Sequence, residues 1–121
     1  MKVLSLFDGI SCGMLALQRA GIPVECYDAF EIDKYAVTVS KRNFPVIVHH
    51  GNVYDGDFTQ FKGYDLLLGG SPCTYWSIAK KDREIDCDGE GFRLFQEYVR
   101  ALEESGCQYF LYENNLSLIH I

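Results

Sequence analysis

Residues 65–77 read DLLLGGSPCTYWS, a short apolar run that is broken by two glycines and then stiffened by a proline. A leucine run of this length, bounded by turn residues, is typical of a strand buried on both faces of a parallel sheet. Proline fixes its own φ angle and restricts the residue before it, so Ser71 and Pro72 are predicted to form a rigid turn. Cys73 is therefore expected just beyond the carboxyl end of a central strand, where open α/β sheets place their ligands. A cysteine there is either a nucleophile or an inert small hydrophobic residue.

Strand and helix patterns alternate along the whole chain. Apolar runs typical of strands occupy residues 1–6, 24–30, 46–48, 64–68 and 109–112. Apolar residues recur at helical spacing in residues 14–20, 33–43 and 91–104, and the polar residues 74–90 are predicted to form a loop. The alternation predicts an α/β fold, in which β-α-β units with right-handed crossovers build a parallel sheet. The unusual polar residues follow predicted strands, so we expect them to meet at one edge of that sheet.

Composition and charge limit the classes of function. The 121 residues, 48% apolar and 23% charged, are those of one globular domain or part of one. No apolar run approaches the roughly 20 residues of a membrane span and the N-terminus lacks a signal-peptide profile, so a cytoplasmic protein is expected. Five widely spaced cysteines without a C-x-x-C pair indicate reduced thiols, and no metal site is expected. The net charge of −6 argues against unaided binding to nucleic acid, because phosphate contacts need clustered Lys and Arg.

The first predicted strand runs directly into the loop FDGISCG at residues 7–13. Gly9 and Gly13 allow close backbone approach, and the following helix offers free N–H groups to an anion. The spacing D-G-x-x-x-G differs from the dinucleotide fingerprint, and the Asp8 carboxylate would repel a pyrophosphate, which argues against a dinucleotide oxidoreductase. The same carboxylate would attract a cation such as the ammonium and sulfonium of S-adenosylmethionine. The alternative is a plain tight turn in which Ser11 caps the helix.

Two further strand ends carry groups suited to an adenosyl ligand. Glu31 follows the first loop by about 20 residues, the distance at which an acidic residue commonly accepts hydrogen bonds from ribose hydroxyls. Its neighbour Ile32 could cover one face of an adenine, and the Asn52 amide could meet the adenine edge. The alternatives are a solvated strand-end charge for Glu31 and a turn role for Asn52.

Glu113 ends the fifth predicted strand, beside the expected position of Cys73. A cysteine next to an acid suggests nucleophilic attack combined with proton donation to an electron-poor ring. The alternative is a structural glutamate that accepts hydrogen bonds from loop amides. His49 and His50 are interpreted as loop residues, because no carboxylate or cysteine stands at metal-ligand spacing from them.

Taken together, these motifs resemble those of DNA (cytosine-5)-methyltransferases, especially the phage and bacterial enzymes. The resemblance covers nearly the whole chain in order: FDGISCG at 7–13, Glu31, GNV at 51–53, GGSPC at 69–73, GFRLFQEY at 91–98 and YEN at 112–114. It implies a Rossmann-like S-adenosylmethionine-dependent methyltransferase fold, with helices on both faces of a parallel sheet that is truncated after the fifth strand.

The resemblance also implies roles for individual residues. S-adenosylmethionine would be bound by Phe7, Asp8, Gly9, Ile10, Ser11, Gly13, Glu31, Ile32, Asn52, Val53 and Leu94. Cys73 would attack carbon 6 of a flipped-out cytosine while Glu113 hydrogen-bonds the ring nitrogen and the exocyclic amine. Asn114 would order the strand end, and Ser71 and Pro72 would contact the substrate base.

The chain also departs from the family pattern. Asn52 stands where Asp is commoner, Thr74 where many members have Gln, and Asn115 where Val is usual. Nothing corresponds to the later basic motif, the target-recognition region or the final helix of the family. We therefore expect residues 1–115 to be a partial catalytic domain and residues 116–121, LSLIHI, to be a non-native tail.

One expectation and two alternatives concern the activity. Double-stranded DNA would be contacted largely by regions that are missing here, so this chain alone is expected not to methylate DNA. A tRNA cytosine-5 methyltransferase of related sequence is an alternative. A non-catalytic accessory module that binds S-adenosylmethionine is another, and the retention of both Cys73 and Glu113 counts against it.

Overall fold

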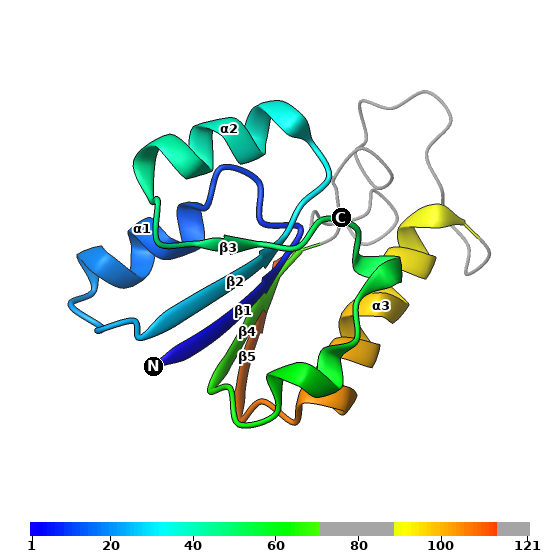
Figure 1. The fold of residues 1–121 in the computed structure, drawn as a ribbon. Helices are drawn as coiled ribbons and strands as arrows, with labels where there is room; N and C mark the ends of the chain where they lie inside the picture. The colour runs from blue at the N-terminus through cyan, green and yellow to red at the C-terminus, as the bar shows by residue number, and fades with distance from the viewer. Residues whose placement is uncertain (71–88, 114–121) are drawn as a thin grey trace, which may run out of the picture.

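The computed structural model describes residues 1–70 and 89–113. Their strands form one parallel sheet, and helices connect these strands (Figure 1). The strands are β1 (Lys2–Leu6), β2 (Cys26–Phe30), β3 (Val48–His49), β4 (Leu66–Gly69) and β5 (Tyr109–Tyr112). They lie in the order β3-β2-β1-β4-β5, and every neighbouring pair is parallel. The predicted parallel α/β sheet is thereby confirmed. The connections change direction between β1 and β4, so the carboxyl ends of these strands border the crevice that such sheets use for ligands.

Three α-helices and two short 3-10 helices connect the strands in the described part of the chain. They are α1 (Cys12–Arg19), α2 (Lys34–Asn43), α3 (Glu90–Ser105), η1 (Val53–Asp55) and η2 (Phe58–Phe61). The α-helices begin and end within two residues of the predicted bounds, whereas the 3-10 helices were not predicted from the sequence pattern. The third strand is shorter than predicted and begins at Val48. The Ile47 N–H donates to the Phe44 carbonyl, and this turn delays the start of the strand.

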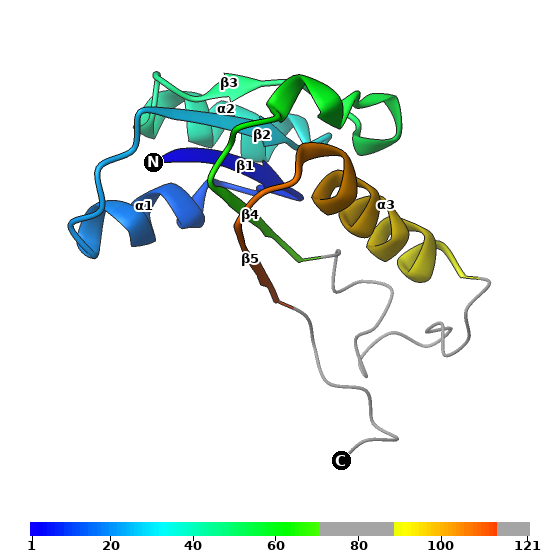
Figure 2. The same cartoon turned by 90° about the horizontal axis from the view of Figure 1, so that it is seen from below.

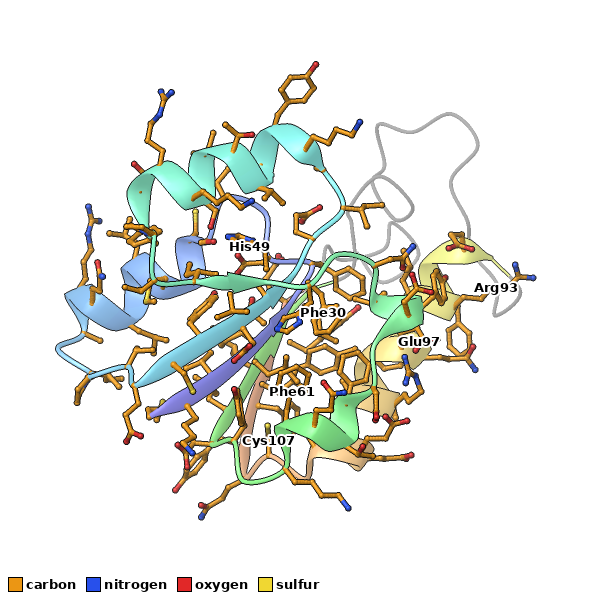
Figure 3. The ribbon with its side chains drawn as sticks, viewed as in Figure 1. Phe30, His49, Phe61, Arg93, Glu97 and Cys107 are labelled. Carbon is orange, nitrogen blue, oxygen red and sulfur yellow. The ribbon has the colours of Figure 1, made fainter. Side chains whose placement is uncertain are left out.

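The helices cover both faces of the sheet, as predicted. Figure 1 shows α1 and α2 on one side and α3 with the 3-10 helices on the other, and Figure 2 shows the strands in succession from β3 to β5. The alternation of side chains along β1 explains this arrangement, because Val3 faces the α1 side and Leu4 the α3 side. The α3 side holds the aromatic core, in which Phe30 of β2 packs against Phe61 of η2 (Figure 3).

Burial falls off toward β5, which is an edge of the sheet. In β4, Leu67 is fully buried, whereas Leu66 and Leu68 are only half-buried. The strand was predicted to be buried on both faces, and it is fully buried only on the face that carries Leu67. In β5, Tyr109, Phe110 and Leu111 are 56–62% exposed. An edge strand with exposed apolar side chains can pair with a further strand or bind another protein. None of the helices in the described residues is long and apolar enough to span a membrane.

Candidate active site

A cavity of about 390 Å³ opens at the carboxyl ends of β1, β2 and β3, beside the first turn of α3. Six of its lining residues are among those predicted to bind the cofactor: Phe7, Glu31, Ile32, Asn52, Val53 and Leu94. The remaining lining residues are Phe30, Gly51, Tyr54 and Glu90. These residues come together because parallel strands bring their carboxyl ends, and the loops that follow them, to the same edge of the sheet.

Glu31 holds the first loop against the end of β2. Its Oε1 accepts a hydrogen bond from the Gly9 N–H at 2.8 Å, and its Oε2 accepts from the Ile32 and Asp33 N–H groups at 3.0 Å each. A carboxylate oxygen can accept two hydrogen bonds, so Oε1 keeps one acceptor position. The side chain is half-buried and tied to three backbone groups, which is more than a solvated strand-end charge would show.

Asp8 is enclosed by hydroxyl groups from three parts of the chain. Its Oδ1 accepts from Ser5 Oγ at 2.7 Å and from Tyr27 Oη at 2.6 Å, and its Oδ2 accepts from Ser11 Oγ. Ser11 Oγ in turn lies 2.5 Å from Ser40 Oγ of α2. Burial, and then the Asp8 charge, raise the pKa of Tyr27, so its hydroxyl remains a proton donor. These hydrogen bonds replace those that the Asp8 carboxylate would make with water.

The first loop has an unusual backbone. Phe7 and Ser11 both have left-handed φ angles, 56° and 69°, which are uncommon for residues other than glycine and are often found at functional sites. Ser11 precedes α1 in the capping position, yet its side chain accepts no hydrogen bond from the helix. A Cβ on Gly13 would lie 2.8 Å from Leu68 Cδ1 and 2.9 Å from Tyr27 Oη, so only glycine lets α1 pack this closely.

A second cavity, of about 280 Å³, lies at the ends of β1, β4 and β5. Its lining includes Asp8, Cys12, Gly70 and Glu113, and Phe7 lines both cavities, which therefore meet at that side chain. The Glu113 N–H donates to the Gly69 carbonyl at 2.9 Å, which continues the β4–β5 pairing.

Gly70 allows the end of β5 to approach β4 closely. A Cβ on this residue would lie 2.1 Å from the Glu113 carbonyl oxygen, so no larger residue fits without a backbone shift. The Glu113 side chain is exposed. Cys73 follows Gly70 by three positions and lies, with Ser71, Pro72 and Asn114, outside the described residues.

Arg100 of α3 anchors the wall of the first cavity, a role that sequence reasoning missed. Its guanidinium donates to the carbonyls of Val53 and Gly56, at 2.9 Å each, and lies 4.6 Å from the ring centroid of Phe58. It also pairs with Glu97, which lies on the same helix (Figure 3). The only sequence signal was the position of Arg100 on a helix predicted to pack against the sheet.

The two histidines have more partners than their interpretation as loop residues predicts. His49 is the last residue of β3, and its Nε2 lies 3.5 Å from Ser40 Oγ. His50 Nε2 lies 2.7 Å from Asp28 Oδ1, and the ring stacks on Phe30. Asp28 precedes His50 by 22 positions, so no spacing argument could pair them. Within residues 1–70 and 89–113, no cluster of His, Cys, Asp or Glu is arranged to hold a metal ion.

Comparison with known proteins identifies the family. The sequence model of the family described as "C-5 cytosine-specific DNA methylase" matches residues 1–121. The chain belongs to this family. It is 36% identical to an orphan methyltransferase of Bacillus phage SPR, M.SPRI, over 99% of this chain and 27% of that protein. It is 34% identical to the type II methyltransferase M.HgiCII of Herpetosiphon aurantiacus, over 98% of this chain and 26% of that protein. The chain thus spans about a quarter of the length of these curated relatives.

Solved structures share the fold of this methylase-family chain. A crystal structure of a Spodoptera frugiperda DNMT2 mutant matches with a TM-score of 0.73 at 23% identity, over 99% of this chain and 37% of the other. A crystal structure of the S. pombe Dnmt2 methyltransferase matches with a TM-score of 0.72 at 21% identity, over 99% of this chain and 38% of the other. At this identity the similarity shows the Rossmann-like methyltransferase fold alone.

The methylase motifs meet at two adjoining places. Among the predicted cofactor residues outside the first cavity, Asp8 and Gly13 line the second, and Gly9 binds Glu31 through its N–H. Ser11 of the first loop is fully buried. Ile10 of the same loop is about half exposed and lines neither cavity. Glu113 lines the second cavity together with Gly69 and Gly70.

Proposed function

We propose that the protein carrying this chain transfers a methyl group from S-adenosylmethionine to carbon 5 of cytosine in DNA, through a covalent adduct with Cys73. The observation that carries the proposal is the first cavity, which gathers six of the motif residues from four separate elements. Family membership supports the reaction class. The second cavity adjoins the first at Phe7 and contains Glu113, so cofactor and base would have neighbouring sites.

The first cavity suits S-adenosylmethionine in its chemistry. Phe7, Ile32 and Leu94 supply apolar surface for an adenine ring, and Ile32 is 71% exposed, which leaves its side chain available to a ligand. Glu31 keeps an acceptor position for a ribose hydroxyl. Asp8 supplies negative charge behind the loop, on the side of the second cavity. The bound cofactor would supply an electrophilic methyl group to the base.

The residues of the chain would activate the base. The Cys73 thiolate forms a bond to carbon 6 of the cytosine, and Glu113 hydrogen-bonds the ring nitrogen and the exocyclic amine, which draws charge out of the ring. Addition of the thiolate at carbon 6 makes carbon 5 nucleophilic, so carbon 5 would accept the methyl group, with S-adenosylhomocysteine as the leaving group. Loss of the carbon-5 proton to a base and cleavage of the sulfur–carbon bond restore the aromatic ring and the thiolate. The base must first leave the duplex, which costs a few kcal/mol of stacking and pairing energy, and contacts between the base and the pocket have to offset this cost.

DNA that contains 5-fluorocytosine tests this proposal. Fluorine at carbon 5 blocks the final proton loss, so the full-length protein should remain attached to the DNA and shift on a denaturing gel. Cys73→Ser should abolish the shift. Cys12→Ser is the matched control, because Cys12 is exposed and lines the same cavity as Glu113. An adduct that survives in Cys73→Ser would contradict the assignment of the nucleophile.

Two further outcomes of the same assay separate the alternatives. An adduct formed with fluorinated tRNA and not with DNA would indicate the tRNA cytosine-5 reaction. Cofactor binding without an adduct on either nucleic acid would indicate an accessory module.

A further inference from the structure

We propose that Glu90 and Asn52 read the purine edge of the cofactor, with Glu90 accepting a hydrogen bond from the exocyclic amine of adenine and Asn52 donating one to the neighbouring ring nitrogen. Glu90 was not among the residues assigned to the cofactor from the sequence. The inference rests on the proposed function, because it concerns the cavity assigned there to S-adenosylmethionine.

Of the two carboxylates in the cavity, Glu90 has the greater acceptor capacity to spare. The described lining residues include two carboxylates, Glu31 and Glu90. Three backbone N–H groups already occupy most of Glu31. Glu90 Oε1 accepts one hydrogen bond, from Tyr54, and Glu90 Oε2 lies 3.9 Å from an Arg93 nitrogen, too far for a hydrogen bond. A ligand that brings N–H donors would therefore find its acceptor at Glu90.

Tyr54 fixes the two reading groups relative to each other. Its backbone N–H donates to Asn52 Oδ1 at 2.9 Å, and its hydroxyl donates to Glu90 Oε1 at 2.6 Å. Burial, and then the hydrogen bond to Glu90, raise the pKa of Tyr54 to about 12, so the hydroxyl keeps its proton and the contact at neutral pH. Because the Asn52 oxygen already accepts from the Tyr54 N–H, its amide N–H₂ is left to donate to a ligand.

The Glu90 acceptor and the Asn52 donor are complementary to the edge of adenine and mismatched with the edge of hypoxanthine. Adenine presents an amine donor at position 6 and an acceptor at ring nitrogen 1. Hypoxanthine presents a carbonyl acceptor and an N–H donor at these positions, so both contacts would be reversed. The apolar walls formed by Ile32 and Leu94 would contact the ring faces of either purine and would not distinguish them.

A simpler role for Glu90 is to stabilise the start of α3. A negative charge in the first turn of a helix interacts favourably with the helix dipole, and Glu90 stands in that turn. This role, however, needs no contact with Tyr54, which comes from a different element 36 positions earlier in the chain. It also predicts that replacing Glu90 changes the affinity for both purines equally.

Calorimetry with S-adenosylhomocysteine and S-inosylhomocysteine on the full-length protein tests the inference. The wild type should bind the adenosyl compound at least about tenfold more tightly, because a site built to hydrogen-bond one edge leaves polar groups unpaired with the other. In Glu90→Gln the ratio of the two affinities should fall to within about twofold, since an amide can donate as well as accept. Tyr54→Phe should lie between these, because it releases Glu90 without removing the carboxylate.

Glu103→Gln is the matched control, since Glu103 is an exposed residue of the same helix that lines neither cavity. The ratio should stay at the wild-type value in this variant. An unchanged ratio in Glu90→Gln, or a wild type that binds both compounds equally, would overturn the inference and leave the proposed function intact. A wild type that binds neither compound would instead overturn the proposed function, and the inference with it.

Discussion

Around the ends of β1 and β2 the carboxylates already have partners, whereas at the ends of β4 and β5 the Glu113 carboxylate is exposed. Three backbone N–H groups hold Glu31, and three hydroxyls hold Asp8. Glu113 is positioned through its backbone instead, by the hydrogen bond to Gly69 and the close approach to Gly70. The ends of β1 and β2, which we propose bind the cofactor and call the cofactor half, are thus preorganised by polar contacts. The ends of β4 and β5, which we propose receive the base and call the base half, are organised by the close approach of two backbones.

This difference predicts that substitutions in the two halves affect the protein in different ways. Removal of a polar group from the cofactor half should cost binding and stability together, because Glu31 also ties its loop to Gly9 of the first loop, and Asp8 ties the first loop to β1 and β2. A small increase in size in the base half should cost chemistry first, because it changes a distance and leaves the cofactor cavity in place.

Gly70→Ala should have the largest effect. The added Cβ would lie 2.1 Å from the Glu113 carbonyl oxygen, so the end of β5 must move away from β4. A displacement of about 1 Å at a reacting group can cost on the order of 100-fold in rate, and we expect at least that loss in methyl transfer to DNA. Cofactor affinity, measured by calorimetry, should change little.

Gly13→Ala is the corresponding change in the cofactor half. Its Cβ would meet side-chain atoms of Leu68 and Tyr27, which can shift more easily than backbone. It should therefore lose less methyl transfer than Gly70→Ala and more cofactor affinity. The opposite order would break the distinction between the two halves.

Glu31→Ala should have the next largest effect. It leaves the N–H groups of Gly9, Ile32 and Asp33 without their acceptor, and hydrogen bonds to charged groups are worth about 1.5–3 kcal/mol. Loss of one such bond to the ribose predicts an affinity for S-adenosylmethionine that is lower by roughly 10- to 100-fold. Asp8→Ala should also weaken binding and should lower the thermal stability, since it removes the carboxylate that accepts from three hydroxyl groups. Undiminished cofactor binding in both variants would contradict the assignment.

Arg100→Lys tests how the cavity wall is held. Lysine cannot donate from a planar fork to two carbonyls, so the contacts to Val53 and Gly56 should not both persist. We expect a loss of about 1–3 kcal/mol in the free energy of unfolding, measured by urea denaturation. Arg93→Lys is the matched control on the same helix, where a largely exposed ion pair should contribute less than about 1 kcal/mol. Equal losses in the two variants would show that Arg100 does not anchor the wall.

The smallest expected effect concerns pH. Burial, and then the positive charge of Lys41, lower the pKa of His49 below its ordinary value of 6.5. The unfolded chain therefore takes up a proton at a higher pH than the folded protein does. The stability from this residue is fully present above pH 6.5 and is lost as the pH falls toward the lower folded pKa. His49→Gln should reduce the fall in unfolding free energy between about pH 7 and 5.5. Identical slopes for wild type and variant would contradict this.

The sequence predicted the frame of the site well. Strand and helix periods differ enough to be recognised in short segments, and a parallel sheet brings all strand ends to one edge, so the position of Glu31, Asn52 and Glu113 at that edge follows from the pattern of residues alone. The motif order also indicated the family, which the comparisons confirm. The roles of the individual residues toward cofactor and base stay predictions.

Only the tertiary structure determined which side chains touch. Tyr54 and Glu90 are 36 positions apart, Asp8 and Tyr27 are 19 apart, and Arg100 lies 47 positions from Val53. Hydrogen bonds between such residues depend on how helices pack on the sheet to within a few tenths of an ångström, and no periodicity in the sequence contains that distance. The sequence by itself determined that carboxylates and glycines reach the carboxyl edge of a parallel sheet. Packing decided that Glu31 and Asp8 are held by neighbours, and that Glu90 lines the same cavity as Glu31 and has an oxygen free to accept a hydrogen bond.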